Sequence, residues 1–382
     1  MAAPTKGLEQ VVLGRSALTL VAGETGGLVY RGFPIQSLVP GTTYEAIVHL
    51  FLHGSPPREP RPESVRADLA HHRRLSPEME RLIDLLPTDR PPLDALRTMI
   101  SALGDARFPY PATEAQGRIL IGAVPTMLAR YVQRQRGRTP LAPSDRAGHA
   151  EDYLRMVTGS APTEPQVHAL EDYLVLLADH GMNASTFALR VVLSTNSDLI
   201  SAATAALGAL KGPAHGGAPS KVSDMLDAVA DAGNAETWIR GTLGRGERLF
   251  GFGHRAYKTE DPRGVLLHRI ARQIADPRRL ALAEAVEARA LEALAREKPG
   301  RRLYTNVEFY SAVVLEAVGL PRELFTPTFA VARTVGWAAH ALEQVADNRL
   351  IRPDTEYTGR VDGTWPLARG WDAPALGAAG SA

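Results

Sequence analysis

The sequence predicts an all-α fold with one small β-hairpin near its N-terminus. Apolar residues recur at helical spacing through most of the chain, and several of these segments open with a Ser or Thr of the kind that caps helices. Only one short stretch has the character of paired strands. With 382 residues the chain can bury a large core, and this length favours two domains.

The hairpin is expected at residues 17–31. Two apolar runs there flank a glycine-rich turn, which is the pattern of two short antiparallel strands. The first helix follows: Thr42 and Glu45 have the spacing of a capping box, and Gly54 is expected to end the helix.

Helices are expected through nearly all of the remaining chain. Those of the first half are 76–86, a segment from Thr113 that Pro125 kinks, 163–181 and 184–212. Those of the second half are 218–231, 235–247, 263–275, 279–297, 306–318 and 321–347, of which the last has the small and apolar residues of a buried helix. The tail after Trp371 is rich in Ala and Gly, and we expect it to be disordered.

Composition excludes several classes of protein. The formal net charge is only +1, which argues against a polybasic nucleic-acid binder. The sequence has no cysteine, so disulfides, thiolate zinc sites and cysteine nucleophiles are excluded. Residues 1–10 lack the apolar core of a signal peptide, and the longest apolar run, 119–129, is too short to span a bilayer. We therefore expect a cytoplasmic protein.

The segment 250–263 carries the strongest functional signal. Glycines before His254 allow the backbone to present this side chain at a surface, and Arg255, Lys258 and Arg263 follow closely. Such cations suit the recognition of carboxylates or phosphates. From these residues alone, a solvated basic loop with a structural histidine remains an equal alternative.

Three further patches combine a break in the helices with an ionisable group. His180 lies at a helix junction, His215 lies in the glycine-rich loop 212–217, and Glu308 opens a helix after Arg301 and Arg302. Singly, each has a simpler explanation as a helix cap, a turn residue or a partner of the helix dipole. Three histidines and a carboxylate could also indicate a metal site, but the spacing is not that of known ligand motifs, which disfavours this alternative.

Taken together and in order, these motifs resemble the citrate synthase family over about residues 7–359. The matching segments are Tyr30-Arg31-Gly32, Ala178-Asp179-His180 with Asn183-Ala184-Ser185-Thr186, Gly212-Pro213 with His215-Gly216-Gly217, Gly251-Phe252-Gly253-His254-Arg255 with Asp261-Pro262-Arg263, Arg333 with Gly336-Trp337 and His340, and Ile351-Arg352-Pro353 with Tyr357 and Gly359. Several independent motifs in the right order make the resemblance specific.

The resemblance implies an acyltransferase of the tricarboxylic acid cycle. It would condense acetyl-CoA with oxaloacetate and hydrolyse the product to citrate and CoA, with no metal and no permanently bound cofactor. The family's fold implies a homodimer whose large domain comprises 1–217 and 325–382, the latter including the C-terminal tail. The small domain would be 218–324, and the two domains would close over the substrates.

The resemblance also implies roles for individual residues. Glu308 would take a proton from the acetyl methyl group, His215 would hydrogen-bond the thioester oxygen, and His254 would donate to the oxaloacetate carbonyl. The expected ligands of oxaloacetate are His180, Arg263, Arg333 and Arg352, of which Arg352 would reach the partner subunit's site. Phosphates of CoA would contact Lys258, with Arg301 and Arg302 as weaker candidates.

The sequence departs from the family at four positions. Glu308 stands where an aspartate is usual, and its extra methylene displaces the carboxylate by about 1.5 Å on a fixed backbone. Gly181, Ala214 and Asp354 replace a glutamate, a leucine and an arginine. Ala214 could leave room for propionyl-CoA, so 2-methylcitrate synthase is an alternative activity. A third possibility is a non-catalytic or weakly active paralogue, for which Glu308 is the only support.

Overall fold

The computed structural model describes residues 6–8, 11–297, 300 and 302–359. It divides into two compact units, a larger one of residues 15–351 and a smaller one of 1–14 with 352–382. In the described part of the smaller unit, a 3-10 helix spans Lys6–Leu8 and residues 352–358 carry no helix or strand. The tail after Trp371, expected to be disordered, lies outside the described residues.

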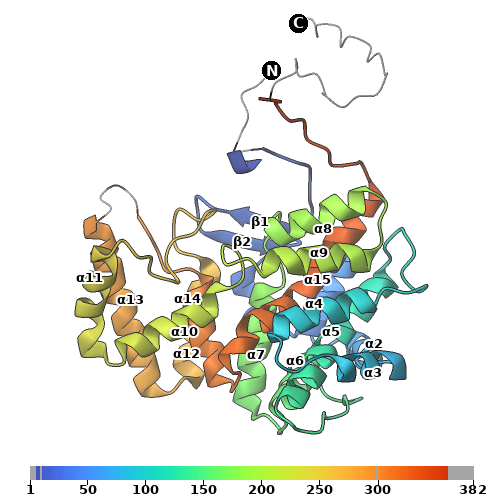
Figure 1. Ribbon diagram of the computed structural model, residues 1–382, viewed down its shortest axis with the longest axis horizontal. Coiled ribbons are helices and arrows are strands. Elements are labelled where there is room, and N and C mark those ends of the chain that lie inside the picture. Colours follow the sequence, from blue (N-terminus) through green and yellow to red (C-terminus); the bar gives the residue numbers. More distant parts are fainter. Residues whose placement is uncertain (1–5, 9–10, 298–299, 301, 360–382) are drawn as a thin grey trace, which may run out of the picture. The chain divides into compact units, whose positions relative to one another are not determined.

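The larger unit is built of helices with one small sheet, which confirms the predicted fold class (Figure 1). Its first helices are α1 Tyr44–His53, α2 Glu63–His72, α3 Pro77–Leu85, α4 Pro92–Ala102, α5 Glu114–Gln135, α6 His149–Thr158, α7 Glu164–Leu177, α8 Ala184–Ser194 and α9 Leu199–Leu210. The remaining ones are α10 Ala218–Val229, α11 Ala235–Gly244, α12 Pro262–Ile274, α13 Pro277–Glu297, α14 Val307–Ala317 and α15 Phe325–Ala346.

The predicted hairpin is present and has a third strand that the sequence did not indicate. Strands β1 Thr19–Ala22 and β2 Gly27–Tyr30 pair antiparallel, and β3 Phe33–Pro34 pairs with β2. Tyr30 is fully buried and donates its hydroxyl to the carbonyl of Asp179 at 2.9 Å. The sheet is therefore tied to a segment in which the sequence predicted a functional histidine.

The first helix starts one residue later than the capping box predicted. Thr43, not Thr42, is the N-cap, and its hydroxyl accepts from the Ala46 N–H at 3.2 Å. Glu45 does not complete a capping box, because its buried carboxylate accepts from the backbone N–H of His149 at 2.7 Å. A tertiary contact thus replaces the local one.

The prediction of one helix over 184–212 is wrong. The chain breaks between α8 and α9, where Asn196 has a positive φ of 66°. Asp198 then caps α9 by accepting from the Ser201 N–H at 2.8 Å. Asn tolerates the left-handed conformation and Asp is a strong N-cap, so this Asn-Ser-Asp sequence was a readable stop-and-start signal.

Helix α15 lies at the centre of the larger unit, as expected for its apolar sequence. It packs against α1, α5, α7, α8 and α9, and Trp337 and His340 on it are fully buried (Figure 1). In the described part of the chain, no helix has both the length and the apolar character needed to cross a membrane.

Helices α10–α14 form the segment predicted as a small domain. Among them, α12 packs against α14, and α11 packs against α13 (Figure 1). The larger unit contains all of 218–324, so the boundaries of this domain stay a prediction.

Candidate active site

A tight turn between α7 and α8 presents His180. Gly181 has a φ of 58°, a conformation that favours glycine, and its N–H donates to the Asp179 carboxylate at 2.9 Å. The His180 Nε2 lies 3.2 Å from the hydroxyl of Tyr257. Burial, together with the positive charge of Arg263, lowers the pKa of His180 well below its ordinary value. His180 is therefore neutral at physiological pH.

The start of α8 holds His215. Asn183 caps this helix by accepting from the Ser185 N–H at 3.1 Å, and the same Ser185 N–H lies 3.3 Å from the His215 Nε2. The Ser185 hydroxyl lies closer to this Nε2, at 3.0 Å, and donates its own proton to Asn183 Oδ1 at 2.7 Å, so it can accept from the ring. Burial and the charge of Arg333 lower the pKa of His215 to about 4. A neutral imidazole keeps a ring N–H with which it can hydrogen-bond a substrate oxygen.

The loop that carries His254 is fixed against the start of α14. The Gly253 N–H donates to the Tyr304 carbonyl at 2.7 Å, and the Asn306 N–H donates to the Gly251 carbonyl at 2.9 Å. The Asn306 side chain adds a bond to the Gly253 carbonyl at 2.9 Å. These bonds place the histidine loop and the first turn of α14, which holds Glu308, side by side.

The hydrogen bonds of His254 define its tautomer. Its Nδ1 accepts from the backbone N–H groups of Ala256 at 2.9 Å and Tyr257 at 3.2 Å. The proton of the neutral ring is then on Nε2. Arg263 Nη2 lies 3.5 Å from this Nε2, at the limit of hydrogen-bond distance, so the two shorter bonds decide the assignment. Burial and the charge of Arg263 lower the pKa of His254 to about 4, which keeps the ring neutral.

Arg263 is held by a bidentate ion pair. Its Nε and Nη2 donate to the two oxygens of Asp261 at 3.0 and 2.7 Å, and both side chains are buried. Asp261 also caps α12 and accepts from the Val307 N–H at 3.2 Å. One carboxylate thus fixes the guanidinium and the start of the helix that carries Glu308.

Arg333 is buried, and four of its five N–H donors have no acceptor among the described residues. Only 1% of the residue is exposed, and its Nε donates to the Leu177 carbonyl at 2.8 Å. Nη1 and Nη2 are buried and have no partner among the described residues, and the guanidinium lies 4.7 Å from the ring centre of Phe329. A buried guanidinium that lacks an anionic partner is costly, so these two nitrogens are suited to bind an anion.

Glu308 is half-buried in the first turn of α14. Burial raises the pKa of its carboxyl group to about 7, against the opposing charge of Arg263. A carboxylate with a pKa near neutrality is suited to take a proton in general base catalysis.

The structure brings some of the predicted site residues close together. The rings of His180 and His254 are 5.3 Å apart, and the charges of Arg263 and Arg333 both act on His180. The charge of Arg333 also lowers the pKa of His215. The sequence predicted no role for Tyr257 or Asp261, although Asp261 could have been recognised as the N-cap before Pro262.

The predicted phosphate ligands are less defined. Lys258 forms an ion pair with Glu24 in the hairpin turn at 3.2 Å, and Arg302 is exposed. Arg301 lies outside the described residues. Arg352 belongs to the smaller unit, where its side chain is 78% exposed and 3.8 Å from the Asp354 carboxylate.

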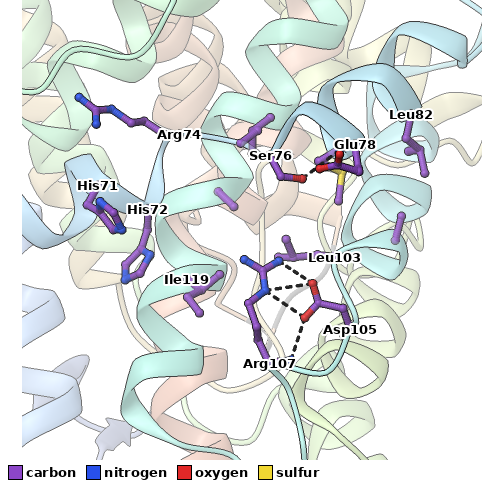
Figure 2. A pocket seen from close by; sticks show the side chains of 14 residues that line it. His71, His72, Arg74, Ser76, Glu78, Leu82, Leu103, Asp105, Arg107 and Ile119 are labelled. Atoms are coloured by element: carbon purple, nitrogen blue, oxygen red, sulfur yellow. Dashed lines mark hydrogen bonds and ion pairs between the residues drawn. The ribbon is translucent and has the colours of Figure 1, made fainter.

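A cavity elsewhere in the larger unit contains none of these residues. It has a volume of about 290 Å³ and is lined by α2, α3, α4 and α5. Figure 2 shows Arg107 directed toward Asp105, and Arg74 pairs with Asp145 outside the lining, so the arginines at this cavity already have anionic partners. Within the described ranges, no group of three or more His, Asp or Glu side chains could hold a metal ion.

Comparisons with known proteins point to one family. The family model described as citrate synthase, C-terminal domain, matches residues 7–354. Citrate synthase from Haloferax volcanii is 38% identical over 94% of this chain and 96% of its own length. A 2-methylcitrate synthase from Mycobacterium tuberculosis is 35% identical over 94% of this chain and 92% of its own length. The ternary complex of citrate synthase from Thermoplasma acidophilum with carboxymethyl coenzyme A and oxaloacetate superposes with a TM-score of 0.88, at 29% identity over 94% of this chain and 97% of that chain.

Proposed function

The chain belongs to the citrate synthase family, and from this premise we propose that it condenses acetyl-CoA with oxaloacetate and hydrolyses the product to citrate and CoA. The observation that carries the proposal is the grouping of His180 and His254, whose rings are 5.3 Å apart, and His215 around Arg333, two of whose nitrogens have no partner within the described part of the chain. An anion that fits these nitrogens would lie against groups able to polarise a carbonyl.

We assign oxaloacetate to the arginines. One carboxylate would occupy the free Nη1 and Nη2 of Arg333, which offer the parallel donors of a bidentate bond. Arg263 would bind the other end, since its fork is held in place by Asp261. His180 would hold the substrate from the turn, and the Nε2–H of His254 would point to the keto oxygen.

The first chemical step is removal of a proton from the acetyl methyl group. The Glu308 carboxylate would accept this proton, and the ring N–H of the neutral His215 would donate to the thioester oxygen, on which negative charge develops. The resulting enolate carbon would then attack the keto carbon of oxaloacetate. A new carbon–carbon bond forms and the thioester carbonyl is restored. The Nε2–H of the neutral His254 would hydrogen-bond the alkoxide left on the keto oxygen, and the proton that Glu308 took would return to this alkoxide.

Hydrolysis completes the reaction. Water adds to the thioester of the condensed product, the carbon–sulfur bond breaks, and CoA leaves as the thiol with the proton that water supplies. The Lys258 ammonium and Arg302 are proposed ligands of the CoA phosphates. For Lys258 this requires release from Glu24, an exposed pair that costs little to separate.

We further propose a homodimer in the cytoplasm, in which 218–324 acts as a closing domain and Arg352 completes the partner's site. The exposed Arg352 side chain supports this role, since its ion pair with Asp354 is long and solvent-exposed and costs little to separate. These features rest on the family and on the residues named here.

The test is release of free thiol from acetyl-CoA with and without oxaloacetate. We expect release that depends on oxaloacetate. Release without oxaloacetate would indicate a thioesterase, and no release at all would leave a binding protein. Propionyl-CoA is assayed in parallel, because a relative is named 2-methylcitrate synthase. A higher kcat/KM with propionyl-CoA would favour that second activity.

A further inference from the structure

We propose that His340 and Arg190 act through Asp179 as positioning residues that hold His180 in place for oxaloacetate. The inference rests on the proposed function, in which His180 is a ligand of that substrate. Asp179 and His340 are fully buried, and Arg190 is 6% exposed. Asp179 lies in the α7–α8 turn, His340 on α15 and Arg190 on α8. The hydrogen-bonded chain formed by these three side chains therefore crosses the centre of the larger unit.

The hydrogen bonds run in one direction along this chain. Arg190 donates to the His340 Nδ1 from Nη2 at 2.7 Å and from Nε at 3.2 Å. Because a guanidinium has no acceptor, the lone pair of the imidazole must be on Nδ1, and its proton on Nε2. That Nε2 lies 3.2 Å from the Asp179 carboxylate, to which it donates. A neutral imidazole therefore links a buried cation to a buried anion.

Asp179 stays ionised and fixes the turn on both sides of His180. Burial alone would raise the pKa of Asp179, but its partners His340 and Arg333 lower this pKa to about 2. The Asp179 carboxylate accepts from the Gly181 N–H at 2.9 Å, and its backbone carbonyl accepts from the Tyr30 hydroxyl at 2.9 Å. The side chain between these two anchors is His180.

Helix α15 packs closely against the α7–α8 turn. A Cβ atom added to Gly336 would lie 2.5 Å from the Ala178 carbonyl oxygen and 2.6 Å from Asp179 Oδ1. Real Cβ atoms do not approach so closely, so the helix backbone itself touches the turn. A displacement of His340, one turn further along α15, is thus transmitted to Asp179.

The outer end of the chain is also anchored. Arg190 Nη1 donates to the Gln344 Oε1 at 3.2 Å, and Nη2 forms an ion pair with Glu343. His340, Glu343 and Gln344 share one face of α15, being three and four residues apart. Arg190 therefore cannot move away from the imidazole without breaking three contacts on the same helix.

Stability alone does not account for this arrangement. Well-packed apolar side chains of similar volume often replace a buried ionic chain without loss of stability. What these hydrogen bonds supply is direction, because Arg190 can only donate, His340 relays the bond, and the last acceptor is the Asp179 carboxylate in the turn of His180. The expected consequence is a specific effect on oxaloacetate, not on the thioester.

The test compares two substitutions of His340 with a matched control. His340→Leu removes both hydrogen bonds, whereas in His340→Gln the amide oxygen can accept from Arg190 and the amide N–H can donate to Asp179. The control is His149→Leu, since His149 is also fully buried, its ring nitrogens have no hydrogen-bond partner among the described residues, and its ring only stacks on Tyr44. For each protein, KM is measured for oxaloacetate and for acetyl-CoA. Binding of oxaloacetate in the absence of acetyl-CoA is measured separately, as a thermal shift.

We expect His340→Leu to raise the KM for oxaloacetate at least about tenfold, as loss of an orienting partner does for ligating histidines, with the KM for acetyl-CoA within twofold. His340→Gln should restore most of the affinity, and His149→Leu should change neither KM. Should His340→Leu fail to fold, Arg190→Met, which leaves the imidazole free to turn, should raise the KM for oxaloacetate at least about threefold.

An unchanged KM for oxaloacetate in His340→Leu, or in Arg190→Met if that is the variant that folds, would overturn the inference, as would equal rises for both substrates. If the wild type itself shows no thermal shift with oxaloacetate, the proposed function is at fault and the positioning role falls with it.

Discussion

Replacing Glu308 with glutamine should affect activity and stability in opposite directions. The amide keeps the shape of the side chain but cannot accept the methyl proton. Turnover should therefore fall by at least about 10²-fold, the lower end of what a positioned acid–base group supplies. The affinity for oxaloacetate should change little, because Arg263 and Arg333 hold that substrate.

The gain in stability follows from the raised pKa of Glu308. Its folded-state pKa of about 7 compares with an ordinary value of 4.5. The folded protein thus binds more protons than the unfolded chain between these values, and stability falls as pH rises through this window. At 1.36 kcal/mol per pKa unit, the full cost above pH 7 is about 3 kcal/mol as an upper bound. Glutamine carries no such cost.

Urea unfolding at pH 8 and pH 5 measures this effect. Glu308→Gln should raise the free energy of unfolding by up to about 3 kcal/mol at pH 8 and by much less at pH 5. The control is Glu292→Gln on α13, an exposed partner of Arg289, which should shift stability by no more than about 0.5 kcal/mol at either pH.

Two results would refute this account of Glu308. If glutamine turns over as fast as the wild type, Glu308 is not the base. If Glu308→Gln is no more stable than the wild type at pH 8, its carboxylate is not held in an unfavourable environment. Glu308→Asp adds detail: in a site built around the longer side chain, the shorter carboxylate should be slower.

Three further predictions follow from the same site. Below about pH 7, kcat/KM should fall about tenfold per pH unit as Glu308 is protonated, and a flat profile between pH 5 and 8 would contradict its role. Oxaloacetate should raise the melting temperature of the wild type but much less that of Arg333→Met, because the two Arg333 nitrogens that have no partner among the described residues are the proposed ligands of one carboxylate; an equal rise would refute its assignment. Mixing inactive Arg352→Ala with inactive His254→Ala subunits should restore activity if the partner completes each site, and mixtures without activity would contradict the shared site.

Much of the fold could be predicted because local signals agree with tertiary ones. The hairpin at 17–31, the end of α1 at Gly54 and the cap at Ser76 are all present. Of the errors, the helix over 184–212 overlooked a local signal at Asn196 and Asp198, whereas the capping box at Thr42 failed because a distant group competed with the local one. Glu45 accepts from the N–H of His149 and does not form the expected capping box. No sequence pattern within the helix indicates that contact.

The site was predictable in its reacting groups and not in its supports. Histidines beside glycines are visible in the sequence, since glycine marks a loop that can present a side chain. The carboxylates that support these groups are harder to recognise. Asp261 reads as an ordinary N-cap of α12, although it also holds Arg263. The role of Asp179 depends on His340, which is 161 residues away and which only folding brings to it.

The most direct test follows the acetyl methyl carbon. The protein is incubated with oxaloacetate and acetyl-CoA labelled with ¹³C at the methyl group, and the products are analysed by NMR while free thiol is titrated. We predict that the label appears as a methylene carbon of citrate, in an amount equal to the thiol released. Label recovered as free acetate, or thiol released without labelled citrate, would contradict the proposed condensation.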